Sequence, residues 1–217
     1  MIATFASTKG GCGKSVLAIN VAIIRAKGGQ RRTLLVDADE QGSSATFGEL
    51  RASVDFSVVS LHGSAVLEGI KHHAPDFPEI VVDVGGRDTE SLRAALLVTN
   101  RLIVPVQPRS LDIWAFENMV SLVAEAKTLN PNLIAYSILS LADAQGKDNE
   151  QAANLLTQYD ATITHLDCPI VRRKVWADAI SAGLGVTEYT PRNSKAVAEI
   201  GNLVKAIYAT RSSSRGR

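Results

Sequence analysis

Cysteine is scarce in this sequence, since Cys12 and Cys168 are the only two among 217 residues. Two cysteines so far apart provide neither a disulfide framework nor a tetrahedral metal set, so we expect reduced thiols. Long apolar runs are also missing, because no window approaches the roughly 20 residues that a membrane-spanning helix requires. Residues 1–8 lack the basic start and apolar stretch of a secretory signal. These absences predict a cytoplasmic protein with its own hydrophobic core.

The sequence has almost no overall excess of charge of either sign, because the formal net charge is +1. The balance is uneven, however: residues 1–165 hold 14 Lys and Arg against 18 Asp and Glu, and residues 166–217 hold 9 against 4. Cationic side chains bind phosphate backbones without reading the base sequence. We therefore expect a non-specific DNA-binding surface near the C-terminal end, with a scattered solvated surface as the alternative. The candidate contacts are Arg172, Arg173, Lys174, Arg192, Lys195, Lys205 and Arg211.

Short apolar runs alternate with segments of helical periodicity. The predicted strands are residues 2–6, 33–36, 80–84, 102–106 and 135–141, and the predicted helices are residues 15–27, 91–99, 112–129 and 149–159. This alternation predicts a doubly wound, mainly parallel α/β sheet with helices on both faces. The Gly28-Gly29 pair is expected to end the first helix. The length fits one domain, residues 1–211, followed by a flexible basic tail, residues 212–217.

The strongest feature follows the first predicted strand, where residues 7–15 read Ser-Thr-Lys-Gly-Gly-Cys-Gly-Lys-Ser. Glycines let backbone N–H groups turn around an anion, and the following helix N-terminus adds positive potential. This pattern is typical of a P-loop NTPase, in which Lys14 contacts the terminal phosphates of ATP and Ser15 completes a Mg²⁺ shell. The expected nucleotide contacts in this segment are Lys9, Gly10, Gly11, Cys12, Gly13, Lys14, Ser15 and Val16.

The loop departs from the usual G-x-x-x-x-G-K-[ST] pattern, because Thr8 stands where the first glycine is expected and Lys9 follows it. With this second lysine, the loop resembles the deviant Walker A motif of the ParA/MinD family. The resemblance implies that two ATP-bound copies form a nucleotide-sandwich homodimer, in which Lys9 reaches the ATP of the other copy. Lys9 and Lys14 are therefore candidate catalytic residues.

Three acidic residues, Asp37, Asp39 and Asp83, follow predicted strands and should meet at one edge of the sheet. The segment of Asp37 and Asp39 resembles the family's Walker A′ segment, with Glu40 where proline is common. The segment of Asp83 resembles the Walker B strand and its switch loop. The resemblance implies that Asp37 organises Mg²⁺ through water, Asp39 orients or activates the attacking water, and Asp83 belongs to the metal site. Such positioning and charge stabilisation suffice for slow ATP hydrolysis.

The resemblance to ParA-type ATPases extends through most of the chain. Residues 104–112 look like the strand and loop after Walker B. Residues 170–173 stand where many members have an Ile-Pro-Arg segment near adenine, so Val171 and Arg172 are the expected base contacts. The chain starts with the P-loop strand, which resembles short members that lack a helix-turn-helix. Site-specific operator binding is therefore not expected.

The resemblance implies a partition or positioning ATPase, as in plasmid partition and DNA segregation. ATP would close the dimer on nucleoid DNA, and a ParB-like or cargo-bound adaptor would trigger hydrolysis and release. A membrane-associated ATPase of the MinD kind is an alternative, because residues 196–210 are amphipathic. Core packing is the simpler interpretation of that stripe, since its basic face is sparse. Trp114 and Trp176 are interpreted as packing or interface anchors rather than base-stacking platforms.

Two further alternatives depend on single features of the sequence. A nucleotide-dependent reductase like the nitrogenase iron protein shares the deviant loop, but Cys168 has no second cysteine nearby to help hold a cluster. A DNA scaffold that does not hydrolyse ATP would tolerate the loss of Asp39. DNA is the expected partner, and a membrane is the alternative to it.

Overall fold

The computed structural model describes residues 1–7, 9–27, 31–53, 55–86, 89–110 and 113–209. The Gly28-Gly29 pair, Arg211 and the tail over residues 212–217 lie outside these ranges, so the predictions made for them stay predictions.

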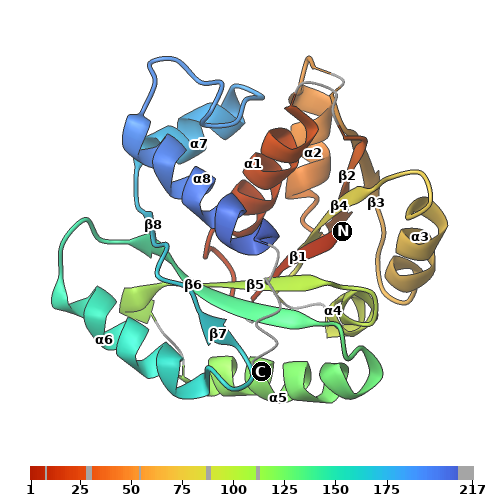
Figure 1. Cartoon of the computed structure of the whole chain (residues 1–217). Helices are drawn as coiled ribbons and strands as arrows, with labels where there is room; N and C mark the ends of the chain where they lie inside the picture. The colour runs from red at the N-terminus through yellow and green to blue at the C-terminus, as the bar shows by residue number, and fades with distance from the viewer. Residues whose placement is uncertain (8, 28–30, 54, 87–88, 111–112, 210–217) are drawn as a thin grey trace, which may run out of the picture.

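The centre of the molecule is a parallel β-sheet with the strand order β3-β2-β4-β1-β5-β6-β7, in which β8 also pairs with β6 (Figure 1). Every pairing between strands of the described chain is parallel. The strands are β1 (Ile2–Ala6), β2 (Thr33–Ala38), β3 (Ser57–Ser60), β4 (Glu79–Val84), β5 (Arg101–Val106), β6 (Ile134–Ala142), β7 (Thr164–His165) and β8 (Ile170–Val171). The chain leaves β1 toward β2 and β3, then places β4 between β1 and β2, so the carboxyl end of β1 lies at the centre of the ligand-binding edge.

Helices cover both faces of this sheet (Figure 1). One face packs against α1 (Lys14–Ala26), α2 (Ser43–Leu50), α7 (Lys174–Ser181) and α8 (Ser194–Tyr208). The other packs against α3 (Ala65–His73), α4 (Thr89–Leu96), α5 (Ile113–Leu129) and α6 (Lys147–Leu156). Two short 3₁₀ helices, η2 (Pro108–Ser110) and η3 (Thr157–Tyr159), follow β5 and α6. The doubly wound parallel sheet expected from the sequence is confirmed.

The alternation of side chains along the strands decides where the acidic residues lie. In β4, Ile80 and Val82 belong to the core on the α5 face, and Val81 belongs to the core on the α1 face. Successive side chains in a strand point to opposite faces, so Asp83 points to the same face as Val81. Asp37 is the direct partner of Asp83 in the register of β2 and β4. Both carboxylates therefore lie on the α1 face, where the phosphate loop begins.

All five predicted strands are present. Each observed strand has the predicted bounds or extends beyond them by no more than two residues at an end. The shorter elements β3, β7, β8, α2, α3 and α7 were not predicted from the sequence. In α8, Ile200, Leu203 and Ile207 are fully buried, which confirms core packing as the role of the amphipathic stripe. Among the described residues, no helix is long and apolar enough to cross a bilayer.

Arg51, at the end of α2, connects that helix to the segment after α7. Its side chain is 4% exposed and forms ion pairs of 2.9 Å with both Asp55 and Glu188. Its guanidinium also donates a hydrogen bond to the carbonyl oxygen of Gly183. Removing this cation leaves two carboxylates uncompensated, so we expect Arg51→Met to lower the free energy of unfolding by about 2–4 kcal/mol. Urea unfolding measures this loss.

The matched control is Arg93→Met, which removes the exposed ion pair between Arg93 and Glu125. Exposed pairs of this kind contribute less than about 1 kcal/mol, so the free energy of unfolding should change little. Equal losses in the two variants would contradict the role given to Arg51.

Candidate nucleotide site

The loop between β1 and α1 has the backbone conformation that an anion-binding loop requires. Gly11 and Gly13 have φ angles of 76° and 85°, in the left-handed region that favours glycine. Gly13 is the residue that caps α1, and it offers no side chain to occupy the first N–H groups of the helix. The N-terminus of α1 is therefore open to a phosphate group.

Three side chains hold the carbonyl groups of this loop. The Ser7 hydroxyl donates to the carbonyl oxygen of Lys9 at 2.7 Å, and the Ser140 hydroxyl donates to that of Cys12 at 2.7 Å. The side-chain amide of Gln107 donates to the carbonyl oxygen of Gly11 at 2.6 Å. Carbonyl oxygens would repel phosphate. Because these three accept hydrogen bonds from side chains, the loop is prepared to bind an anion.

Asp37 is fully buried and has both carboxylate oxygens in use. One oxygen accepts a hydrogen bond from the backbone N–H of Asp39 at 3.0 Å, and the other accepts from that of Ala45 at 2.7 Å. The second bond satisfies a free N–H in the first turn of α2. Asp37 thus fixes the loop after β2, and these bonds favour contact with a metal through water.

Asp83 is also fully buried, but only part of its carboxylate is satisfied. Its Oδ2 atom accepts a hydrogen bond from the Ser44 hydroxyl at 2.8 Å, whereas Oδ1 has no hydrogen-bond partner among the residues that the structure describes. Burial raises the pKa of the Asp83 carboxyl to about 6, while hydrogen bonds from Ser15 and Ser44 and the charge of Lys14 oppose the shift. An adjacent cation would stabilise the ionised carboxylate.

These residues fit a magnesium ion. Within the described residues, the unpartnered Oδ1 atom of Asp83 offers a buried oxygen ligand, and Ser15 is one of the groups that lower the pKa of this carboxyl. Among the described residues, no group of three or more His, Cys, Asp or Glu side chains could hold a metal ion alone. Mg²⁺ does not need such a cage, because it is commonly held by one or two protein ligands, water and the phosphates of the substrate.

Asp39 and Lys14 meet at the mouth of the loop. The Lys14 ammonium nitrogen lies 3.9 Å from the Oδ2 atom of Asp39, and the two side chains are 6% and 15% exposed. The Oδ1 atom of Asp39 accepts a hydrogen bond from the backbone N–H of Gln41 at 3.1 Å. Asp39 therefore has an oriented carboxylate that solvent can still reach, as a group that positions an attacking water must be.

A cavity of about 660 Å³ joins these groups to the segment proposed for adenine. Its lining also includes Arg173 and Trp176, which were not assigned to the nucleotide from the sequence, and Leu141. Trp176 is 4% exposed, so its packing role is confirmed. Its indole N–H donates to the carbonyl oxygen of Val171 at 3.0 Å, which fixes the backbone there. Direct base contacts by Val171 and Arg172 stay predictions.

The remaining loop residues differ in exposure. Lys9 is exposed, which is compatible with a reach toward a second copy but does not test it. Cys12 is buried, with its sulfur 2.9 Å from the Ser7 hydroxyl, and neither cysteine forms a disulfide. Ser140 and Gln107 were not predicted as site residues. Ser140 could have been noticed because it is a polar residue inside the apolar run of β6. Gln107 belongs to residues 104–112, which already resembled the strand and loop after Walker B.

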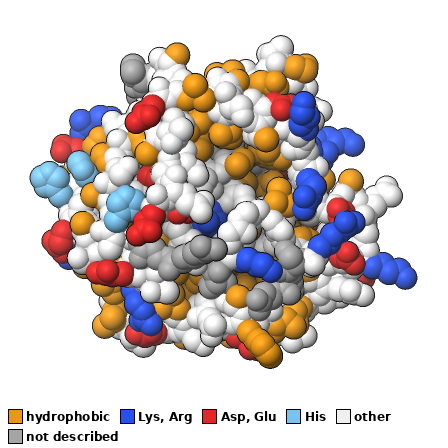
Figure 2. Space-filling model, turned by 180° about the vertical axis from the view of Figure 1, so that it is seen from behind, with side chains coloured by type: hydrophobic (Ala, Val, Ile, Leu, Met, Phe, Trp, Pro, Cys, Tyr) orange, Lys and Arg blue, Asp and Glu red, His pale blue; other side chains and the backbone are white. Residues whose placement is uncertain are grey.

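The predicted DNA contacts lie on α7, α8 and the adjoining loops. Within the described ranges they are exposed, except Arg173, which is half-buried and paired with Glu199 on α8. Figure 2 shows Lys and Arg side chains along one edge of the molecule, together with some acidic ones. This edge corresponds to the side of α6, α7 and β8 in Figure 1. The exposed members of this set are thus accessible, although Lys174 also lies 3.7 Å from an Asp178 oxygen one turn along α7.

Comparison with known proteins identifies this kind of site. The sequence profile of the CobQ/CobB/MinD/ParA nucleotide binding domain matches residues 3–203. The chain belongs to this family. It is therefore an ATPase of the ParA/MinD type, and the P-loop fold expected from the sequence is confirmed.

Two relatives match this ParA/MinD-type chain over most of their length. Maintenance of carboxysome distribution protein A from Halothiobacillus neapolitanus is 26% identical over 211 residues, covering 93% of this chain and 94% of the relative. Protein ParA from Rhizobium radiobacter is 22% identical over 205 residues, covering 93% and 91%. Among solved structures, an ATP complex of McdA from Cyanothece has a TM-score of 0.76 at 16% identity and covers 95% of each chain. This last likeness shows the shared fold.

Gly86 after β4 gives a test of how tightly the phosphate loop is packed. A Cβ atom at Gly86 would lie 2.9 Å from the carbonyl oxygen of Ser7, a backbone atom that cannot move without the loop. We expect Gly86→Ala to lower the melting temperature of the nucleotide-free protein by several degrees, on the order of 1–3 kcal/mol of overpacking. Differential scanning calorimetry measures the change.

Gly10→Ala provides the control for this substitution. A Cβ atom at Gly10 meets nothing within 4 Å, and Gly10 is not among the glycines with positive φ. Its melting temperature without nucleotide should match that of the wild type. A smaller effect for Gly86→Ala than for Gly10→Ala would contradict the packing described here.

Proposed function

We propose that this chain is a positioning ATPase whose ATP-bound homodimer holds DNA without sequence preference. A partner protein then stimulates hydrolysis and releases the dimer. One observation carries the proposal: Lys14, Asp39 and Asp83 converge beside an open helix N-terminus, and Asp83 keeps an unpartnered buried oxygen. A nucleotide with its metal would complete that arrangement, so its binding can favour one conformation of the site.

In the proposed mechanism, each side chain has one task. Lys14 binds the terminal phosphates, and Ser15 and Asp83 hold Mg²⁺, with Asp37 acting on it through water. Asp39 orients the attacking water from the rim of the cavity. Lys9 extends from the exposed loop to the nucleotide of the second copy. The bound metal would neutralise charge on the phosphates, while the protein positions the reacting groups.

Relatives named for carboxysome distribution and for chromosome partitioning support a positioning role rather than a biosynthetic one. The exposed cations on α7 and α8 support DNA as the surface on which the dimer is held. ATP must bind the DNA-holding conformation more tightly than the other one for this switch to work. Hydrolysis then makes the cycle directional, and localisation at the nucleoid follows from DNA binding.

The DNA surface is tested by charge removal at Lys174 and Lys195, which are both exposed. Each change to serine should weaken binding of the ATP-bound protein to non-specific duplex DNA about equally for any sequence. It should also lower the number of counterions released on binding by about one, which is read from the slope of log affinity against log salt concentration. Fluorescence anisotropy over a series of salt concentrations measures both quantities.

Lys71→Ser is the matched control, because Lys71 is an exposed cation on α3, near the opposite edge of the sheet. Its DNA affinity should equal that of the wild type. If all three variants lose the same affinity, the binding reflects overall charge and the surface on α7 and α8 is not the DNA site.

A further inference from the structure

The first turn of α2 contacts both buried acidic residues of the candidate metal site. The backbone N–H of Ala45 donates to an Asp37 oxygen at 2.7 Å. The hydroxyl of Ser44, the preceding residue, donates to the Oδ2 atom of Asp83 at 2.8 Å. Asp37 and Asp83 are direct partners in the register of β2 and β4. One turn of helix therefore holds the two carboxylates that lie near the ends of neighbouring strands.

Ser44 is not the residue that caps its own helix. Gly42 has that position and α2 begins at Ser43, so Ser44 is the second helical residue. Its side chain is fully buried. Buried polar groups in proteins are hydrogen-bonded, and a buried hydroxyl cannot exchange its partner for bulk water. The bond to Asp83 is therefore an internal contact that satisfies the Ser44 hydroxyl.

This hydrogen bond makes the two oxygen atoms of the Asp83 carboxylate unequal. Oδ2 is occupied by Ser44, whereas Oδ1 has no hydrogen-bond partner within the part of the chain that the structure describes. A carboxylate that is held at one oxygen has less freedom to rotate about its Cβ–Cγ bond, so the second oxygen is held as well. Groups that stand behind a metal ligand orient it in this way, and their loss typically weakens metal binding about 10–100-fold.

We propose that Ser44 is a positioning residue for the magnesium ion that accompanies the nucleotide. Ser44 does not bind the ion itself. It occupies Oδ2 of Asp83 and leaves Oδ1 as the oriented oxygen for the metal. The inference rests on the proposed function in one respect, namely that Asp83 is a metal ligand. Its consequence is that loss of the Ser44 hydroxyl weakens only the part of nucleotide binding that needs Mg²⁺.

The test measures binding by the full chain and does not depend on turnover. The probe is a slowly hydrolysed ATP analogue, titrated calorimetrically with Mg²⁺ present and again with EDTA in its place. The ratio of the two affinities is the gain due to magnesium. Ser44→Ala should reduce this gain about tenfold, while its affinity in EDTA should stay within about twofold of the wild type.

A double-mutant cycle shows whether Ser44 acts through Asp83. Asp83→Asn should reduce the gain due to magnesium by itself, because Mg²⁺ is held in proteins mainly by carboxylates, water and phosphate. Adding Ser44→Ala to Asp83→Asn should cause less than about twofold further loss, since the carboxylate that Ser44 orients is already gone. A further loss in the double variant as large as that of Ser44→Ala alone would overturn the proposal.

Ser137→Ala is the matched control for the loss of a buried hydroxyl. Ser137, on β6, is also fully buried, and its hydroxyl shares a hydrogen bond of 3.1 Å with the Nδ1 atom of His165. This variant should melt earlier than the wild type, as Ser44→Ala should, but it should keep the full gain due to magnesium. Equal losses of that gain in the two serine variants would contradict a specific role for Ser44.

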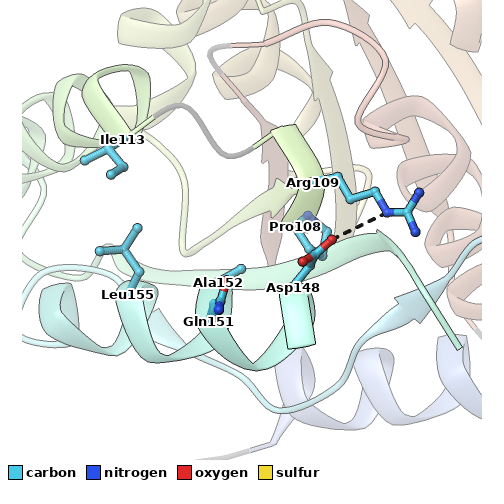
Figure 3. A pocket seen from close by; sticks show the side chains of 7 residues that line it. All are labelled: Pro108, Arg109, Ile113, Asp148, Gln151, Ala152 and Leu155. Atoms are coloured by element: carbon cyan, nitrogen blue, oxygen red, sulfur yellow. Dashed lines mark ion pairs between the residues drawn. The ribbon is translucent and has the colours of Figure 1, made fainter. Parts of the chain in front are cut away.

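Asp148→Asn is the matched control for the loss of a carboxylate. Asp148 lines a second pocket, of about 590 Å³, in which Figure 3 shows it beside Arg109. The Nε atom of Arg109 lies 3.6 Å from the Oδ2 atom of Asp148. This carboxylate is paired with a guanidinium and is not among the residues that line the nucleotide cavity. Its removal should leave the gain due to magnesium unchanged, in contrast to Asp83→Asn.

The role of Ser44 and the metal role of Asp83 can fail separately. If Asp83→Asn keeps the gain due to magnesium, Asp83 is not a metal ligand, and that part of the proposed function fails together with the inference. If Asp83→Asn loses the gain and Ser44→Ala keeps it, the metal site stands and the positioning role of Ser44 is overturned.

Discussion

Replacing Lys14 by alanine should reduce ATP hydrolysis by about 10²–10³-fold, because the phosphate loop loses the cation that stabilises charge in the transition state. Lys14 is 6% exposed and lies 3.9 Å from Asp39, and its charge also favours the ionised form of Asp83. Its removal should therefore weaken ATP binding as well as turnover. Phosphate release at saturating ATP and calorimetric titration with an ATP analogue measure the two effects.

Lys71→Ala is the control for this loss. Lys71 forms an exposed ion pair with Glu68 on α3, far from the phosphate loop, and its removal should leave turnover unchanged. A Lys14→Ala protein that hydrolyses ATP at the wild-type rate would contradict the site assignment.

Replacing Asp39 by asparagine should separate hydrolysis from binding. Asp39 lies on the rim of the cavity, 3.9 Å from Lys14, and its carboxylate is oriented by the backbone of Gln41. Asparagine has nearly the same shape but cannot accept a proton, so turnover should fall by about 10²-fold or more. ATP affinity should change less than about tenfold, because Lys14 and the loop amides still hold the phosphates. Single-turnover kinetics and equilibrium dialysis measure the two quantities.

Glu40→Gln is the closest control, since Glu40 is the next residue and lines the same cavity. It removes a carboxylate whose role the geometry does not place in catalysis, so turnover should stay within about threefold of the wild type. Similar losses in Asp39→Asn and Glu40→Gln would show that negative charge near the cavity matters and that a specific water-positioning group does not.

The central part of the fold could be predicted because its strands are apolar on both faces. β1, β4 and β5 are bounded by polar turns, and their lengths follow from the apolar runs themselves. The strands β3, β7 and β8 were missed because each has only two to four residues and Ile170 is the only buried residue among them, so the local sequence carries little periodicity. Their position depends on pairing with a neighbouring strand.

The candidate site could be predicted where motif and strand end coincide, as at Lys14, Asp37 and Asp83. The partners that arrange it could not be predicted in this way. Ser44 donates to Asp83 from α2, and Ser140 donates to the phosphate loop from β6, 128 residues away along the chain. Such contacts arise from the folding of distant segments onto one edge of the sheet.

The most direct test of the account is pelleting of non-specific duplex DNA with the protein at low and moderate salt. Each protein is tested without nucleotide and with ADP, ATP or a slowly hydrolysed ATP analogue. The two proteins compared are the wild type and Lys14→Ala. We expect salt-sensitive binding by the wild type only when ATP or its analogue is present, and no such binding by Lys14→Ala. Binding that does not depend on nucleotide, or no binding under any condition, would contradict the nucleotide-switched DNA dimer.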